Sequence, residues 1–296
     1  MSRLILTGMV VVASISCGPT AAQQPPAASN LLVSTTELVA HLKDSDLVLL
    51  HVADPATVFE QAHIPGARFL SYGEVAVDGP DELGAELPPM DELKRVLADA
   101  GVSDDSRVVL YGNTVLAARA FFTLDVTGHR RVAVLDGGLP AWQAEGRPVA
   151  TGPSPSPAAK GTFVPRVNQT RLAAAEWIRG HAAAIALVDV RPDAEYTGSD
   201  GGMGGVHAPG HIDGARQLTW NALMAPDGRF LPPAQLREKL SAAGAAPGKP
   251  VVVYCMVGMR ASVMYLVARH LGLDAKLYDG SIVDWTLRKL PTKTGR

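Results

Sequence analysis

Residues 251 to 262, Val251-Val-Val-Tyr-Cys255-Met-Val-Gly258-Met-Arg260-Ala-Ser262, decide the fold of this chain. Four apolar residues before the cysteine are typical of a strand buried on both faces, and the apolar spacing after Arg260 is typical of a helix. The segment therefore predicts a strand, a tight loop and a helix. Similar alternation elsewhere predicts an α/β fold, with mostly parallel sheets and helices on both faces of each sheet.

Cys255 stands at the mouth of this predicted helix. Unpaired backbone N–H groups, the positive end of the helix dipole and Arg260 all favour a thiolate over a thiol. Gly258 allows the loop to curl so that the N–H groups point inward and form an anion-binding nest. A lone cysteine after an apolar strand is otherwise an inert small hydrophobe. Because the surrounding pattern is costly to build without a use, we predict that Cys255 is the catalytic nucleophile.

The first 22 residues have the pattern of a secretory signal peptide. An early positive charge precedes an apolar stretch that is too short for a comfortable membrane span, and small residues follow it. We expect cleavage after Ala22, a flexible segment at residues 23–30, and a periplasmic or secreted protein. Ser14-Ile-Ser-Cys17 resembles a degenerate lipoprotein box, so lipidation at Cys17 is the alternative.

Composition excludes several classes of protein. After processing, Cys255 would be the sole cysteine, which excludes an intramolecular disulfide and a cysteine-rich zinc site. The balance of 27 basic and 29 acidic residues gives no electrostatic case for binding nucleic acid or a membrane surface. No later apolar run is long enough to span a membrane. We expect a monomer that needs no metal and no cofactor.

Short signatures recur in the same order in both halves of the chain, which indicates a tandem duplication. The matching pairs of segments are 47–53 with 185–191, 63–68 with 211–216, 108–112 with 251–255, and 135–142 with 278–285. Residues between the halves are rich in Pro and Gly and predict a linker. The expected organisation is a signal peptide at 1–22, a flexible segment at 23–30, a first domain at 31–150, a linker at 151–163 and a second domain at 164–296.

Some recurring residues are better explained by structure than by chemistry. His63 and His211, each followed by a glycine-containing turn, are expected to shape those turns. Asp136 and Asp279 are likewise expected to end strands in turns. Helices are expected at residues 90–100 and 234–243.

The strand–CMVGMR–helix segment, the HIPGAR and HIDGAR turns and the Asp-Gly-x-x-x-x-Trp closings together resemble the tandem-domain rhodaneses, which are thiosulfate and 3-mercaptopyruvate sulfurtransferases. The resemblance covers essentially all of the chain after residue 30. It implies that the second domain carries the catalytic cysteine and that the first is a degenerate copy. In agreement, the first-domain loop has Gly112 in place of the cysteine, Val115 in place of Gly258 and Ala117 in place of Arg260.

The resemblance also implies a mechanism. Cys255 would take a sulfur atom from a small anionic donor such as thiosulfate, hold it as a persulfide, and pass it to cyanide or a thiol acceptor. Backbone N–H groups of the loop would hold the donor and the persulfide, and Arg260 would add a fixed cation. The residues that contribute these groups are Met256, Val257, Gly258, Met259 and Arg260.

Two departures from the family pattern leave the identity of the donor open. Glu195 stands where an arginine commonly grips the donor, and Arg260 stands where a threonine is frequent. A carboxylate that faced the pocket would repel an anionic donor. Arg260, Arg191 or Arg119 from the first domain are the candidates to supply the missing cation, and we expect the site to lie where the two domains meet.

Two other functions remain open. A phosphatase or arsenate reductase also uses a cysteine, a backbone cradle and an arginine, but Arg260 follows Cys255 one residue sooner than in protein tyrosine phosphatases, which suits a smaller group. A persulfide carrier that serves one partner without turning over small donors is the non-enzymatic alternative. Glu195 and the unusual loop sequence favour this alternative.

Overall fold

The computed structural model describes residues 30–79, 83–157, 159–200 and 210–296. The predicted signal peptide, the lipoprotein-box alternative at Cys17 and nearly all of the flexible segment 23–30 lie outside the described residues. Within them, no helix combines the length and the apolar character that crossing a membrane requires.

The first unit is a five-stranded parallel sheet with the strand order β1-β5-β4-β2-β3. Its strands are β1 Leu32–Val33, β2 Leu47–Ala53, β3 Arg68–Ser71, β4 Arg107–Gly112 and β5 Val132–Leu135. Its helices are α1 Thr35–His41, α2 Ala56–Gln61, the 3-10 helix η1 Tyr72–Glu74, α3 Met90–Asp99, α4 Thr114–Val126 and α5 Gly138–Ala144.

The second unit is a four-stranded parallel sheet with the order β7-β6-β8-β9. Its strands are β6 Ala186–Asp189, β7 Arg216–Gln217, β8 Val251–Tyr254 and β9 Ala275–Leu277. Its helices are η2 Gln169–Arg171, α6 Ala175–His181, α7 Asp193–Thr197, η3 Trp220–Leu223, α8 Pro233–Ala242, α9 Met259–His270 and α10 Ser281–Leu287. The predicted α/β class with parallel sheets is confirmed, and so are the strand before Cys255 and the helices near 90–100 and 234–243.

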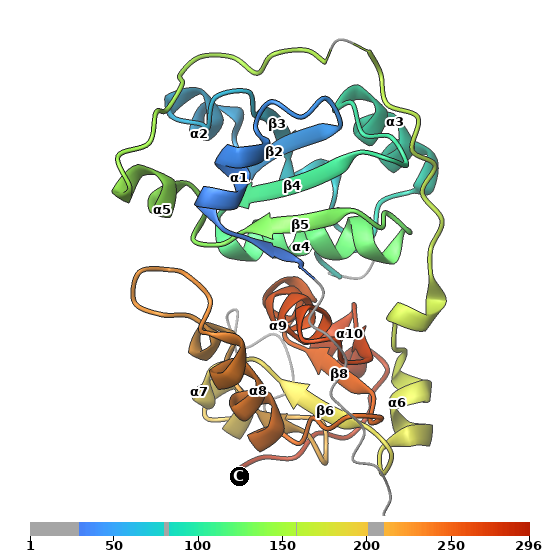
Figure 1. Cartoon of the computed structure of the whole chain (residues 1–296). Helices are drawn as coiled ribbons and strands as arrows, with labels where there is room; N and C mark the ends of the chain where they lie inside the picture. The colour runs from blue at the N-terminus through green and yellow to red at the C-terminus, as the bar shows by residue number, and fades with distance from the viewer. Residues whose placement is uncertain (1–29, 80–82, 158, 201–209) are drawn as a thin grey trace, which may run out of the picture.

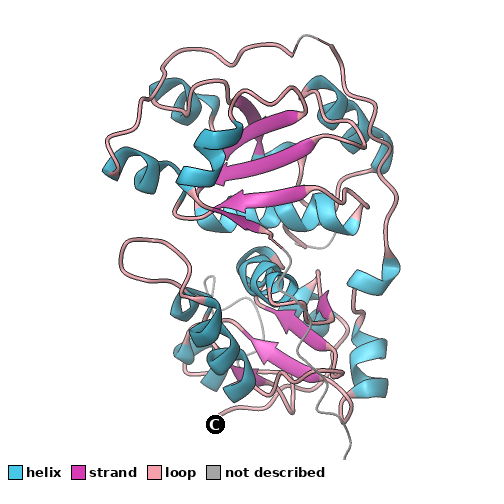
Figure 2. Ribbon diagram, in the orientation of Figure 1, coloured by secondary structure: helices cyan, strands magenta, loops and turns pink. Residues whose placement is uncertain are grey.

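Helices cover both faces of each sheet because successive residues of each strand point to opposite sides. In the first unit, Val48 and Leu50 pack with α3 and α4, whereas Leu49 packs with α1, α2 and α5. In the second unit, Val251 and Val253 pack with α8 and α9, whereas Val252 packs with α6 and α10. Figure 2 shows these layers around both sheets.

The duplicated turns have the same contacts in both units. The ring of His63 stacks on Phe59 at 3.9 Å between centroids, and that of His211 stacks on Tyr196 at 3.9 Å. Both histidines are buried, and each Nδ1 lies within hydrogen-bond distance of a backbone carbonyl. These contacts agree with the predicted role of both histidines in shaping turns.

The two units meet along α4 and α9, which lie against each other in Figure 1. One apolar core cluster includes residues of both helices and of both sheets. At the edge of this contact, Asp125 of α4 accepts hydrogen bonds from the guanidinium of Arg269, at 2.9 and 3.0 Å, and from the hydroxyl of Tyr265. The contact brings the first unit against the helix that follows the cysteine loop.

Candidate active site

The cysteine loop, residues 255–258, connects the carboxyl end of β8 to α9. Gly258 caps the helix with φ +83°, a left-handed conformation that favours glycine. This residue ends the loop, so α9 begins at Met259 and Arg260 lies inside the first helical turn. The helix therefore begins two residues before Ala261, where the apolar spacing in the sequence places its start.

The backbone of the loop is oriented by α10. The carbonyl groups of Cys255 and Met256 accept hydrogen bonds of 3.2 Å from the N–H groups of Ile282 and Val283. The N–H of Cys255 donates to the hydroxyl of Ser281 at 3.1 Å. By contrast, the backbone N–H groups of residues 256–260 have no hydrogen-bond partner among the described residues. Donors without partners close to a cysteine in the chain are what the predicted anion cradle requires.

Gly258 is packed too tightly to carry a side chain. A Cβ at this position would lie 2.7 Å from Oδ1 of Asp279, 2.8 Å from the carbonyl oxygen of Asp279 and 3.1 Å from Nη1 of Arg119. The loop is therefore enclosed on one side by the turn after β9 and by a side chain from the first unit.

Arg119 reaches this loop from α4. Its side chain is fully buried, and both terminal nitrogens bond the carboxylate of Asp279, with Nη2 at 3.2 Å from Oδ2. Burial opposes its charge, but the Asp279 carboxylate outweighs that effect and raises the pKa of Arg119. The Nε of Arg119 is buried and has no hydrogen-bond partner in the described part of the chain. Among the three arginines proposed from the sequence, this one connects the first unit to the cysteine loop.

Arg260 forms a paired contact with Glu195 of α7. Its Nη1 and Nη2 each lie 2.9 Å from one carboxylate oxygen, in a bidentate ion pair. Burial works against the charge of Arg260, but the hydrogen bonds that Arg260 donates to Glu195, together with its interaction with Cys255, raise its pKa overall. Glu195 is thus matched by a cation, and Arg260 is close enough to the sulfur to interact with it.

Arg191 occupies a different environment. It is buried, its Nε and Nη2 bond Asp189 at 2.6 to 3.1 Å, and Nη2 also donates to the carbonyl of Gly210 at 2.7 Å. Its guanidinium lies 5.9 Å from the ring centre of Tyr254. These bonds fix Arg191 at the end of β6 rather than on the cysteine loop.

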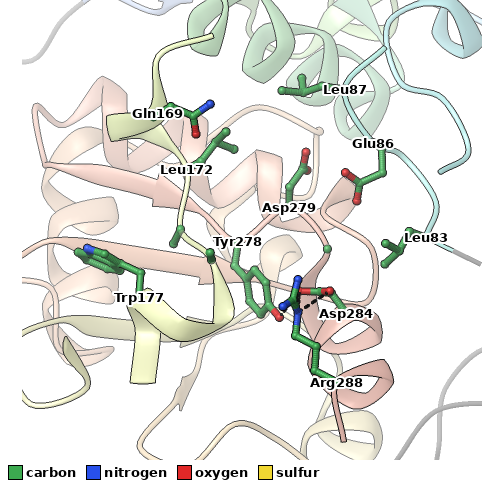
Figure 3. Close-up of a pocket in the computed structure, with 13 residues that line it drawn as sticks. Leu83, Glu86, Leu87, Gln169, Leu172, Trp177, Tyr278, Asp279, Asp284 and Arg288 are labelled. Atoms are coloured by element: carbon green, nitrogen blue, oxygen red, sulfur yellow. Dashed lines mark hydrogen bonds and ion pairs between the residues drawn. The ribbon is translucent and has the colours of Figure 1, made fainter. Parts of the chain in front are cut away.

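A cavity of about 500 Å³ lies beside the loop, between the two units. Figure 3 shows Leu83, Glu86 and Leu87 of the first unit on one side and Tyr278, Asp279 and Asp284 of the second on the other. Cys255 does not line this cavity and is only 1 % exposed. The cavity is therefore a space next to the cysteine loop and does not surround the thiol.

Sequence reasoning missed three residues around the loop. Ser281, with φ +52°, positions the backbone of Cys255. The hydroxyl of Tyr72 is buried and has no hydrogen-bond partner among the residues that the structure describes. Burial raises the pKa of Tyr72 to about 12, with smaller effects from the charges of Arg119, Cys255 and Asp279. Burial, followed by the charge of Asp279, raises the pKa of Glu86 to about 7. No motif marks Tyr72 or Glu86; a serine at the start of α10 is the one available signal.

Comparisons with known proteins concern the fold and the family of the chain. The family description "Rhodanese-like domain" matches residues 34–145 and, again, residues 173–288. The sulfur carrier protein TtuD of Thermus thermophilus is 33% identical over 271 residues, covering 86% of this chain and 93% of that protein. A thiosulfate sulfurtransferase of Azotobacter vinelandii is 31% identical over 262 residues, with coverage of 86% and 93%. The crystal structure of YnjE superimposes with a TM-score of 0.81 at 27% identity, covering 90% of this chain and 68% of that one.

Proposed function

Since the chain belongs to the rhodanese-like domain family and carries that domain twice in tandem, we propose that it is a sulfurtransferase that works through a persulfide on Cys255. The observation that carries the proposal is the cysteine loop. Its cysteine follows a buried strand, and the carbonyl groups of Cys255 and Met256 accept hydrogen bonds from α10. The backbone N–H groups of residues 256–260 have no hydrogen-bond partner among the described residues.

The proposed reaction has two steps that balance in atoms and charge. The Cys255 thiolate attacks the outer sulfur of thiosulfate or a related donor, the S–S bond of the donor breaks, and sulfite leaves with the bonding electrons. The resulting persulfide is then attacked by cyanide or a thiolate acceptor, which removes the outer sulfur and regenerates the Cys255 thiolate.

The loop N–H groups and Arg260 are the groups that would hold the anionic donor and the persulfide. Arg119 would act indirectly, because its buried ion pair with Asp279 holds the turn that packs on Gly258. The first unit would therefore be required for activity although Gly112 replaces its cysteine.

A persulfide carrier with little turnover of small donors is the second candidate. TtuD is named a sulfur carrier protein, and in this chain the cation beside the thiol is paired with Glu195 while the thiol is nearly buried. The same ion pair argues against a phosphatase or arsenate reductase, because both terminal nitrogens of Arg260 are engaged by a carboxylate where a phosphate would need them.

The deciding experiment combines a thiosulfate:cyanide assay with intact-mass measurement of the mature protein. We expect a mass gain of one sulfur atom after thiosulfate is added, followed by thiocyanate formation when cyanide is supplied. Cys255→Ser keeps the size of the side chain but is a poor nucleophile, so both signals should disappear while circular dichroism is unchanged. Retained turnover in Cys255→Ser would remove the sulfurtransferase proposal. A mass gain without turnover would favour the carrier.

We also propose export of the chain, since residues 1–22 have the pattern of a signal peptide. Amino-terminal sequencing of the protein from the periplasm or medium should begin at Gln23. An amino terminus at a lipid-modified Cys17 would indicate a membrane-anchored form instead.

A further inference from the structure

The cavity between the two units, called here the interdomain cavity, adjoins the cysteine loop on two sides. Asp279 and Gly280 line the cavity, and Asp279 is the residue that a Cβ at Gly258 would strike. Leu83 also lines it, and the adjacent Gly84 faces Val257 of the loop, with 3.8 Å between a Cβ placed at Gly84 and the valine side chain. A ligand in this cavity would lie next to the segment that carries the persulfide.

The size and lining of the cavity do not suit the proposed donor. About 500 Å³ is within the range of sites for small organic ligands and exceeds what an inorganic dianion fills. Its walls are largely apolar, with Leu87 and Leu172 among them, and they contribute three carboxyl groups against one arginine. A dianionic donor would be repelled here, whereas the N–H groups of the loop suit it.

Two of the three carboxylates already have cationic partners. Asp279 is bonded to Arg119, and Asp284 accepts hydrogen bonds from Arg288 at 2.8 and 2.9 Å. Asp284 also accepts a hydrogen bond from the hydroxyl of Tyr278. Glu86 differs, because its side chain has no hydrogen bond and no ion pair among the described residues. Figure 3 shows its carboxylate within the lining.

We propose that the interdomain cavity binds the sulfur acceptor and that Glu86 selects a thiol that carries a positively charged ammonium group. This inference rests on the proposed function. A partly desolvated carboxylate without a partner is costly, and an ammonium group from the ligand would supply the missing charge. The apolar walls would hold the carbon chain of the acceptor. Its thiolate would attack the outer sulfur of the persulfide, the S–S bond to Cys255 would break, and the acceptor would leave as its own persulfide.

The test uses three small thiols that differ in charge: cysteamine with an ammonium group, neutral 2-mercaptoethanol, and 3-mercaptopropionate with a carboxylate. The full-length mature protein is loaded with thiosulfate, and single-turnover transfer is followed by loss of the extra sulfur from the intact mass. Rate constants are expressed per thiolate, so that differences in thiol acidity cancel. Measurement at about pH 8 keeps Glu86 largely ionised, since its pKa is about 7.

Cysteamine should react about tenfold faster than 3-mercaptopropionate, with 2-mercaptoethanol between them, and the ratio should fall to about twofold in Glu86→Gln. Glu92→Gln, the same change on the exposed surface of α3, is the matched control and should keep the tenfold ratio. An unaltered ratio in Glu86→Gln would overturn the inference while leaving the sulfurtransferase proposal intact. Failure of the unmodified protein to form the persulfide would overturn the proposed function itself.

A second measurement avoids dependence on the folding of a variant. In the unmodified protein, propylammonium should compete with cysteamine for the cavity, and propionate should not. Equal inhibition by both ions, or by neither, would contradict selection of a cation at Glu86.

Discussion

Glu195→Gln is the substitution that separates two roles for the ion pair beside the thiol. The amide keeps the shape of the side chain and one hydrogen bond to Arg260, but it removes the charge that neutralises the guanidinium. If Glu195 restrains the attraction of Arg260 for anions, the variant should bind thiosulfate more tightly. The improvement should appear mainly in KM, because the change acts on the charge of the bound donor.

The magnitude follows from the geometry of the pair. The pair is bidentate, with two contacts of 2.9 Å, and the side chains of Arg260 and Glu195 are 24% and 12% exposed, which places it between surface and buried ion pairs. Hydrogen bonds to charged groups contribute about 1.5–3 kcal/mol. If solvent screening halves this contribution, freeing Arg260 lowers KM about three- to twelvefold. The same change should lower the free energy of unfolding by about 1–2 kcal/mol.

Initial rates over a range of thiosulfate concentrations, with cyanide saturating, measure KM and kcat separately. Arg260→Gln is the partner variant, and the double variant completes a cycle that isolates the pair. Glu195→Arg would restore the arginine that the family commonly has at this position, but it would bring two guanidinium groups together and is expected to lower KM less than Glu195→Gln. An unchanged KM with a reduced kcat in Glu195→Gln would refute this reasoning and make Glu195 the residue that orients Arg260.

Two further predictions concern the loop and the first sheet. Gly258→Ala should abolish activity and lower stability by about 2 kcal/mol or more, because a Cβ would lie 2.7 Å from Asp279 at φ +83°; Gly214→Ala, with φ +80° and nothing within 4 Å, should lose stability and keep activity. Burial, and then the charge of His63, lowers the pKa of His51 to about 4. The unfolded state therefore binds more protons between about pH 6.5 and pH 4, so the free energy of unfolding should fall by about 2–3 kcal/mol as pH drops through that window. Urea titrations of His51→Leu should show a shallower acid limb, and an equal slope in both proteins would contradict the assignment.

The fold of the second unit was largely predictable because its signals are local. Four apolar residues before Cys255 form β8, Gly258 forms the left-handed cap, and α9 follows within two residues of the expected start. The duplication was predictable for the same reason, since each turn repeats its histidine and glycine and then repeats the same stacking contacts. Periodicity and turn chemistry act over a few residues and are read directly from the chain.

The contacts that enclose the candidate site were not predictable in this way. Asp279 was interpreted as a turn residue, yet its carboxylate binds Arg119, which lies 160 residues earlier. No local rule pairs residues so far apart. The other member of the pair did give a signal in the sequence. Arg119 is a charged residue within the nearly all-apolar helix α4, and a buried arginine requires a partner. Glu86 gave no comparable signal, because the cavity that surrounds it exists only where the two units meet.

The two departures from the family pattern have a joint explanation. From the sequence, the glutamate at position 195 and the arginine at position 260 were separate anomalies, one opposing an anionic donor and one attracting it. In the structure, Glu195 and Arg260 are partners across α7 and the first turn of α9. A positive charge at the start of α9 and a negative charge opposite it would keep a cation near the thiol while weakening the attraction of that cation for free anions. Such an arrangement would favour a donor that brings its own contacts over a small dianion that relies on charge alone, which makes the KM of Glu195→Gln the measurement most sensitive to donor choice.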